Sequence, residues 1–119
     1  MNITRRIKKM RNDYVIRQAE NTVLPVFEAS EIVRYRVSLA GRVQHQGLRL
    51  EIERFAKRLC LTGWIKNKTD GSVDMELQGQ QNKILFVLDF LHALVRIKIK
   101  DDQRFPIEPD PTESSFEIL

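Results

Sequence analysis

The sequence predicts an α+β sandwich, in which two helices cover one face of an antiparallel sheet of four to five strands and a further helix precedes it. Three observations predict this class. Several segments alternate apolar and polar residues with period two, two segments between them carry apolar residues at helical spacing, and a glycine-containing tight turn joins two of the strands.

The first half of the body contains one strand and one helix. Tyr35, Val37 and Leu39 alternate with polar residues, which predicts a strand over 34–40. The helix that follows has its apolar residues on one face, at positions separated by three, four or seven residues. These residues are Leu48, Ile52, Phe55, Ala56 and Leu59.

The second half begins with a hairpin. Strands are predicted over 62–67 and 72–78, and the turn between them contains Gly71, which can adopt a positive φ. A second helix over 81–93, a fourth strand over 95–100, an acidic proline-containing loop over 101–114 and a short strand over 115–119 follow. The order β-α-β-β-α-β is the ferredoxin-like arrangement, which hosts many functions and therefore does not define one.

The N-terminal segment has a separate character. Its apolar residues Ile3, Ile7, Met10 and Tyr14 form one stripe of a helix over 3–20. We therefore divide the chain into an N-terminal helical extension with its connector, 1–33, and a domain over 34–119.

Charge is concentrated in this extension. Residues 1–20 hold six basic and two acidic side chains, which accounts for the whole net charge of +4. Such a segment can contact nucleic acid or acidic lipid, but a solvated helix face is the interpretation we favour. We expect no membrane partner, because no apolar run approaches ~18 residues. One cysteine offers neither a disulfide framework nor a zinc motif, which favours a cytoplasmic location.

The segment GRVQHQGLR, residues 41–49, lies between the first strand and the first helix. Backbone N–H groups at a helix N-terminus are free to bind an anion, and the helix dipole favours negative charge there. Arg49 in the first helical turn can add a bidentate contact, and Arg42 adds positive charge. The alternative is an ordinary polar loop.

The same segment resembles the acylphosphatase loop, whose usual form is GRVQGVGFR. The stretch GWIKNKTDGSV is similar to the family's GWVxNxxDGxV, and its Asn67 follows Arg49 at the family's spacing. The resemblance continues through LQGQQNKI and the FEI near the C-terminus, and it covers about residues 34–119.

The resemblance implies a hydrolase for acyl phosphates, which are carboxylic-phosphoric mixed anhydrides, acting without a metal or cofactor. Its ligands would be a small acyl phosphate or inorganic phosphate, and nucleic acid is not an expected partner. Arg49 and Asn67 take the positions of the family's catalytic arginine and asparagine. The phosphate-binding loop falls on Arg42, Val43, Gln44, His45, Gln46, Gly47 and Leu48.

The loop departs from the family at His45-Gln46, which replaces Gly-Val, and at Leu48, which replaces Phe. A left-handed backbone at position 45 would cost a histidine on the order of 1 kcal/mol. A catalytically weak or inactive anion-binding domain therefore stays open as an alternative. A nucleic-acid binder is a separate alternative, which would need exposed sheet aromatics, and the predicted strands offer few beyond Tyr35 and Trp64.

The second predicted helix carries Leu85, Phe86 and Leu88 where the family has mostly polar residues. An exposed apolar patch usually marks a contact surface. We expect the N-terminal stripe to cover this patch, either within one chain or across a homodimer.

Overall fold

The computed structural model describes residues 2–119. Three helices and five strands follow one another in the described chain. They are α1 (Ile3–Asn21), β1 (Ile32–Arg42), α2 (Leu48–Leu59), β2 (Thr62–Asn67), β3 (Val73–Gln80), α3 (Gln81–Ala93), β4 (Lys98–Ile107) and β5 (Phe116–Ile118).

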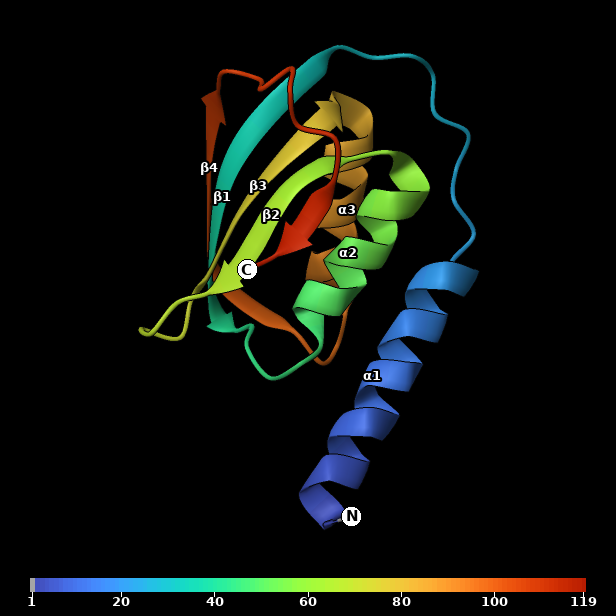
Figure 1. The fold of residues 1–119 in the computed structure, drawn as a ribbon, viewed down its shortest axis with the longest axis vertical. Helices are drawn as coiled ribbons and strands as arrows, with labels where there is room; N and C mark the ends of the chain where they lie inside the picture. Colours follow the sequence, from blue (N-terminus) through green and yellow to red (C-terminus); the bar gives the residue numbers. More distant parts are fainter. Residues whose placement is uncertain (1) are drawn as a thin grey trace.

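The five strands form one sheet in the order β4-β1-β3-β2-β5. The pairs β1–β4, β1–β3 and β2–β3 are antiparallel, and β5 joins β2 in parallel. Helices α2 and α3 lie on one face of the sheet, and α1 lies outside this layer beside α2 (Figure 1). The predicted ferredoxin-like sandwich with an additional N-terminal helix is therefore confirmed.

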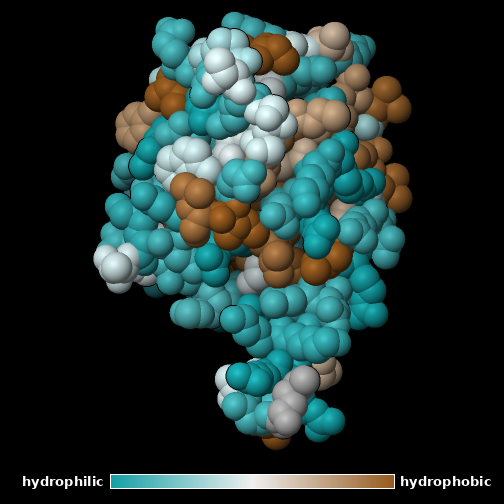
Figure 2. All heavy atoms as spheres, viewed as in Figure 1, coloured by the Kyte–Doolittle hydropathy of each residue, from teal (hydrophilic) through white to brown (hydrophobic). Residues whose placement is uncertain are grey.

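Apolar side chains from the inner face of the sheet pack against α2 and α3. On β1, Val37 and Leu39 are fully buried, as the period-two pattern predicts. All five apolar residues of the predicted α2 stripe are buried. Surface atoms in the view of Figure 2 are mostly hydrophilic, with apolar patches over the middle of the molecule.

Strand β4 differs from its prediction. It begins at Lys98 and continues to Ile107, through a segment expected to be a loop. β4 is an edge strand with β1 as its neighbour, and an edge tolerates both charged residues and proline. Pro106 accordingly lies opposite Tyr35 in the β1–β4 register. Val95, expected in the strand, lies before it and is exposed.

The packing face of α1 also differs from its prediction. The four residues of the expected stripe are between 53% and 73% exposed. Helix α1 instead contacts the body through Val15 and Ala19, which are fully buried and lie one position round the helix from that stripe. The stripe is therefore wrong as the packing face of α1, because the contact with the body is made by one turn that holds a β-branched and a small residue.

The predicted patch on α3 is not covered by α1. Leu88 belongs to the core, and Phe86 packs edge-on against Phe27 of the connector with ring centroids 5.6 Å apart. Leu85 remains 38% exposed. Within one chain, the expected contact between the stripe and this patch is therefore wrong. Leu88 is buried in the core, and a homodimer contact through this helix stays a prediction.

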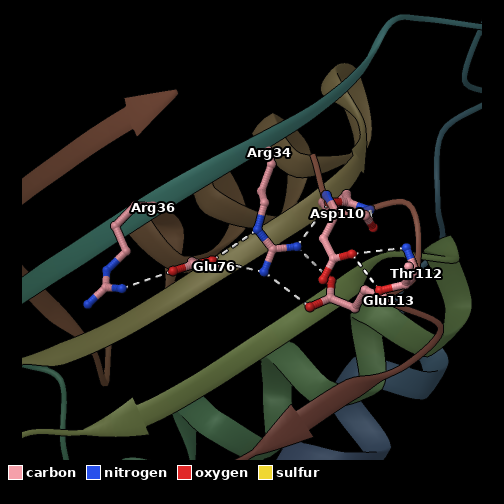
Figure 3. A network of polar contacts seen from close by, with 7 residues as sticks. Arg34, Arg36, Glu76, Asp110, Thr112 and Glu113 are labelled. Atoms are coloured by element: carbon pink, nitrogen blue, oxygen red, sulfur yellow. Dashed lines mark hydrogen bonds and ion pairs between the residues drawn. The ribbon is translucent and has the colours of Figure 1, made fainter. Parts of the chain in front are cut away.

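The sheet face opposite the helices carries a network of charged side chains (Figure 3). Arg34 is 5% exposed and donates to Glu76 and Glu113, and Arg36 donates to Glu76 and Asp74. Partial burial opposes the charged form of Glu76, but hydrogen bonds from both arginines outweigh it and lower the pKa of this carboxyl. The network ties the loop before β5 to β1 and β3.

Two aromatic residues considered for nucleic-acid binding lie on different sides of the sheet. The Tyr35 hydroxyl accepts a hydrogen bond from the Gln81 side chain, on the side of α3. Trp64 lies on the open face, where the Arg36 guanidinium carbon is 4.8 Å from the ring centroid. The pair thus provides no shared platform for stacked bases.

Candidate functional site

A pocket of about 650 Å³ lies at the turn between β1 and α2. The body of the domain provides one part of its lining, and α1 provides the other. The residues of the body are Val43, Gln44, His45, Gly47, Leu48, Arg49, Leu50, Asn67 and Ile118, and those of α1 are Thr4, Ile7, Lys8, Arg11 and Asn12.

The backbone of the turn is shaped by two residues with positive φ. His45 has a φ of 62°, and Gly47, the N-cap of α2, has a φ of 77°. Position 45 therefore has the left-handed conformation for which glycine is the usual residue, and histidine tolerates it better than most side chains do. The turn delivers the chain directly into the N-terminus of α2, where backbone N–H groups are available to an anion.

Gly47 has a second reason to be glycine. A Cβ atom at this position would lie 2.7 Å from Cγ2 of Val15, which belongs to α1. Helix α1 therefore packs directly against the backbone of the turn at Gly47. Leu48 follows, and its side chain is buried in the core and anchors the first turn of α2.

Arg49 and Asn67 reach the pocket from different elements. Arg49 is the second residue of α2, and Asn67 is the last residue of β2. Both side chains are half-buried. Among residues 2–119, neither the Arg49 guanidinium nor the Asn67 side-chain amide has a hydrogen-bond partner, so both are available to a ligand. The structure thus brings together the two residues that the resemblance implied.

Gln44 connects the turn to the β2–β3 hairpin. Its Nε2 donates to the backbone oxygens of Lys68 and Ser72, at 2.7 and 2.8 Å. The hairpin turn is itself fixed, because the Asp70 carboxylate accepts hydrogen bonds from the Ser72 hydroxyl and backbone N–H. Gln44 therefore holds the strand end that bears Asn67 beside the loop.

Two residues of the expected loop do not line this pocket. The Arg42 side chain lies outside the pocket, and its guanidinium is 3.4 Å from the Val95 carbonyl oxygen. Gln46 helps to hold the turn through its backbone, since its carbonyl oxygen accepts a hydrogen bond from Arg96 at 2.9 Å. The resemblance to the family's loop had placed both residues in the phosphate-binding loop.

Arg96 is a positioning residue that sequence reasoning missed. Besides Gln46, it contacts the Gln18 side chain of α1 at 2.8 Å and the Glu51 carboxylate of α2 at 2.5 Å. Glu51 is fully buried, and burial raises the pKa of its carboxyl although Arg96 opposes this effect. A signal for this contact was present, because Glu51 follows Leu48 by three residues on the apolar face of the helix and requires a buried partner there.

The contribution of α1 to the pocket was also missed. Arg11 donates to the His45 carbonyl oxygen at 2.8 Å, and Lys8, one turn earlier, faces the same space. The expected stripe had assigned these basic residues to solvent, and one of its own members, Ile7, also lines the pocket. Within residues 2–119, none of the helices has both the length and the apolar character required to cross a bilayer.

Comparison with known proteins shows which family this chain resembles. The acylphosphatase family model matches residues 35–118. An acylphosphatase from Geobacillus thermodenitrificans is 34% identical over 89 residues, which make up 72% of this chain and 93% of that relative. An acylphosphatase from Trichormus variabilis is 29% identical over 89 residues, 75% of this chain and 88% of that relative.

A solved structure shares the fold. The crystal structure of acylphosphatase from Bacillus subtilis superimposes with a TM-score of 0.67 at 26% identity, covering 73% of this chain and 98% of that one. Helix α1 lies outside the residues matched by the family. On the family match, the relatives and the fold together, this chain belongs to the acylphosphatase family.

Proposed function

We propose that this protein hydrolyses acyl phosphates to a carboxylate and inorganic phosphate. One observation carries the proposal: Arg49 and Asn67, which are eighteen positions apart in the sequence, line one pocket at the N-terminus of α2, and both side chains lack a protein partner among residues 2–119. The division into an extension, 1–33, and a catalytic domain, 34–119, is part of the same proposal.

In this mechanism the phosphoryl group binds at the turn. The N–H groups before α2 and the Arg49 guanidinium hold its oxygens, and the positive end of the helix dipole favours their charge. Arg49 is suited to this role because its planar fork donates two parallel hydrogen bonds. His45, whose side chain is exposed at the pocket, is a loop residue with no required proton-transfer role.

Asn67 positions the attacking water. Water attacks phosphorus, the bond between phosphorus and the acyl oxygen breaks, and the carboxylate leaves. A phosphate oxygen accepts the proton of the water. Since the carboxylate is a good leaving group, catalysis needs mainly positioning and charge stabilisation, so a neutral amide is sufficient. We propose on this basis that the reaction requires no metal, and unchanged turnover in the presence of a chelator is the expected result.

The test combines phosphate binding with turnover of benzoyl phosphate. Arg49→Ala should lose both, and Arg49→Lys should recover little, because lysine lacks the bidentate fork. Asn67→Ala should bind phosphate nearly normally while its kcat falls strongly, since its side chain holds water. Arg17→Ala, an exposed arginine of α1, is the matched control.

Two results would contradict the assignment. Unchanged turnover in Arg49→Ala would exclude this pocket as the active site. Phosphate binding without any turnover by the unmodified protein would favour the second candidate, an anion-binding domain, for which the left-handed His45 is the specific observation. The cytoplasmic location rests on the single cysteine and stays a prediction.

A further inference from the structure

The pocket is larger than a phosphoryl site requires, and α1 forms part of it. Pockets of about 300–1,000 Å³ accommodate ligands with many more atoms than phosphate, and this pocket measures about 650 Å³. We propose that Lys8 and Arg11 of α1 form a second anion subsite, which selects acyl phosphates whose acyl part carries a further negative charge. This inference rests on the proposed function of the same site.

Helix α1 is held in place on the body. Val15 and Ala19 are fully buried, and Val15 packs on the Gly47 backbone. At the C-terminal end of the helix, the Arg58 guanidinium of α2 donates to the carbonyl oxygens of Ala19 and Thr22, at 2.7 and 2.8 Å. The wall that α1 adds to the pocket is therefore fixed by packing and by hydrogen bonds.

The side of α1 that lines the pocket is mainly polar and basic. It contains Thr4, Lys8, Arg11 and Asn12, which recur at the spacing of one helical turn, and one apolar residue, Ile7. Figure 1 shows the N-terminal half of α1 extending past the turn between β1 and α2. The residues of α1 that line the pocket belong to this half of the helix. Residues suited to a hydrogen-bonded ligand thus occupy the part of α1 that has no core contact.

The charges of the pocket are unbalanced. Its lining includes Lys8, Arg11 and Arg49 and contains no aspartate or glutamate. Within residues 2–119, the Lys8 ammonium has no carboxylate within ion-pair distance, whereas the neighbouring Lys9 pairs with Asp13 at 3.4 Å. The Arg11 guanidinium donates to the His45 carbonyl oxygen and to Asn12 Oδ1, so within the described chain it adds positive charge to the pocket without a carboxylate partner. A doubly charged phosphoryl group at Arg49 and the loop therefore leaves the Lys8 ammonium for another anionic group.

The ligand chemistry follows from this division. A neutral acyl part would leave Lys8 without a partner, and a carboxylate or second phosphate on the acyl part would pair with it and approach Arg11. Arg11 already donates to the His45 carbonyl oxygen, so it also fixes the distance between the two anion subsites. The specificity-determining residue that can be tested cleanly is Lys8, because it has no such structural contact.

Binding is measured first, with two stable phosphonates that differ in one charged group. We expect 4-phosphonobutyrate to bind more tightly than butylphosphonate, and Lys8→Gln to weaken only the former, by about fivefold. Lys9→Gln is the matched control, since it removes the same charge from the next position, outside the pocket. Added salt should reduce the preference, because the subsite is open to solvent.

Turnover is measured with benzoyl phosphate and 4-carboxybenzoyl phosphate, a rigid pair. The same preference should appear in KM and not in kcat, since the second anion is distant from the reacting bond. Equal affinity for both phosphonates, or equal effects of Lys8→Gln and Lys9→Gln, would overturn the subsite. A Lys8-dependent preference in binding without turnover of either substrate would support the subsite and reject the proposed hydrolysis.

Discussion

Arg96→Met is the change that should report most directly on how the loop is held. The Arg96 guanidinium joins three elements: the turn through the Gln46 carbonyl oxygen, α1 through Gln18, and α2 through Glu51. Methionine preserves much of the side-chain volume and removes every hydrogen bond. The Glu51 carboxylate, which is fully buried, then has no cation beside it.

Breaking a buried ion pair by removing one partner typically costs about 3–5 kcal/mol, since it leaves an uncompensated buried charge. The Arg96 side chain is 19% exposed, so water can partly replace it, and we expect a loss of about 3 kcal/mol at pH 7. With a urea slope of about 2 kcal/mol/M, the denaturation midpoint should fall by about 1.5 M.

The loss should depend on pH with a defined sign. The pKa of the Glu51 carboxyl is raised in the folded protein, by burial, so its protonated form is favoured there. Its contribution to stability is complete below its ordinary pKa, near 4.5, and is lost as pH rises through the folded pKa. Without Arg96 that pKa rises further, so the cost of Arg96→Met should increase between pH 5 and pH 8.

The assay is urea denaturation of four proteins at pH 5 and pH 8: the unmodified chain, Arg96→Met, Glu51→Gln and the double variant. A neutral glutamine needs no cation, so the double variant should recover much of the stability that Arg96→Met loses at pH 8. A loss below about 1 kcal/mol, or one that is equal at both pH values, would refute the reasoning about a stranded buried carboxylate.

Two further predictions concern the loop backbone and the open sheet face. His45→Gly should change stability by less than about 1 kcal/mol, because relief of the left-handed conformation is offset by the flexibility of glycine in the unfolded chain. In the same variant, kcat/KM for benzoyl phosphate should rise by up to about tenfold, because the backbone amides can approach the anion more closely. A fall in kcat/KM would show a direct role of the imidazole. Glu76 should stabilise the fold above its ordinary pKa, near 4.5, and this contribution should be lost as pH falls through its lowered folded pKa. Acid denaturation of Glu76→Gln should therefore begin from a lower stability, by about 1–3 kcal/mol, and show a shallower pH dependence, whereas an unchanged acid transition would exclude this carboxylate from the stabilising network.

The sequence by itself determined most of the sandwich. Periodicity is a local property, so α3 and β2 were predicted with the bounds that the structure has, and the apolar face of α2 was predicted correctly. The two motifs also determined the candidate site, because Arg49 and Asn67 each have a fixed place relative to a helix start or a strand end. Fold topology then brings those ends to one pocket.

Other features depend on neighbours that are distant in the sequence. The local sequence of the charged, proline-containing segment that starts at Asp101 predicts a loop. Its first residues instead extend β4, because β1 has a free edge with which they can pair. Glu51 is a charged residue on the apolar face of α2, which the local sequence does not explain. Its partner Arg96 is forty-five positions away in the sequence. Pairing across the fold decided both outcomes.

Helix α1 separates most clearly what the local sequence determines from what tertiary contacts determine. The sequence determined that it is a helix, because the spacing of its side chains is sufficient for that. Its orientation was decided by tertiary contacts, among them the close approach of Val15 to Gly47 and the hydrogen bond from Arg11 to the His45 carbonyl oxygen. Tyr14 and the rest of the more apolar stripe stayed exposed, because the loop presents a glycine and a carbonyl oxygen, which favour a small contact and a cation over a larger apolar surface.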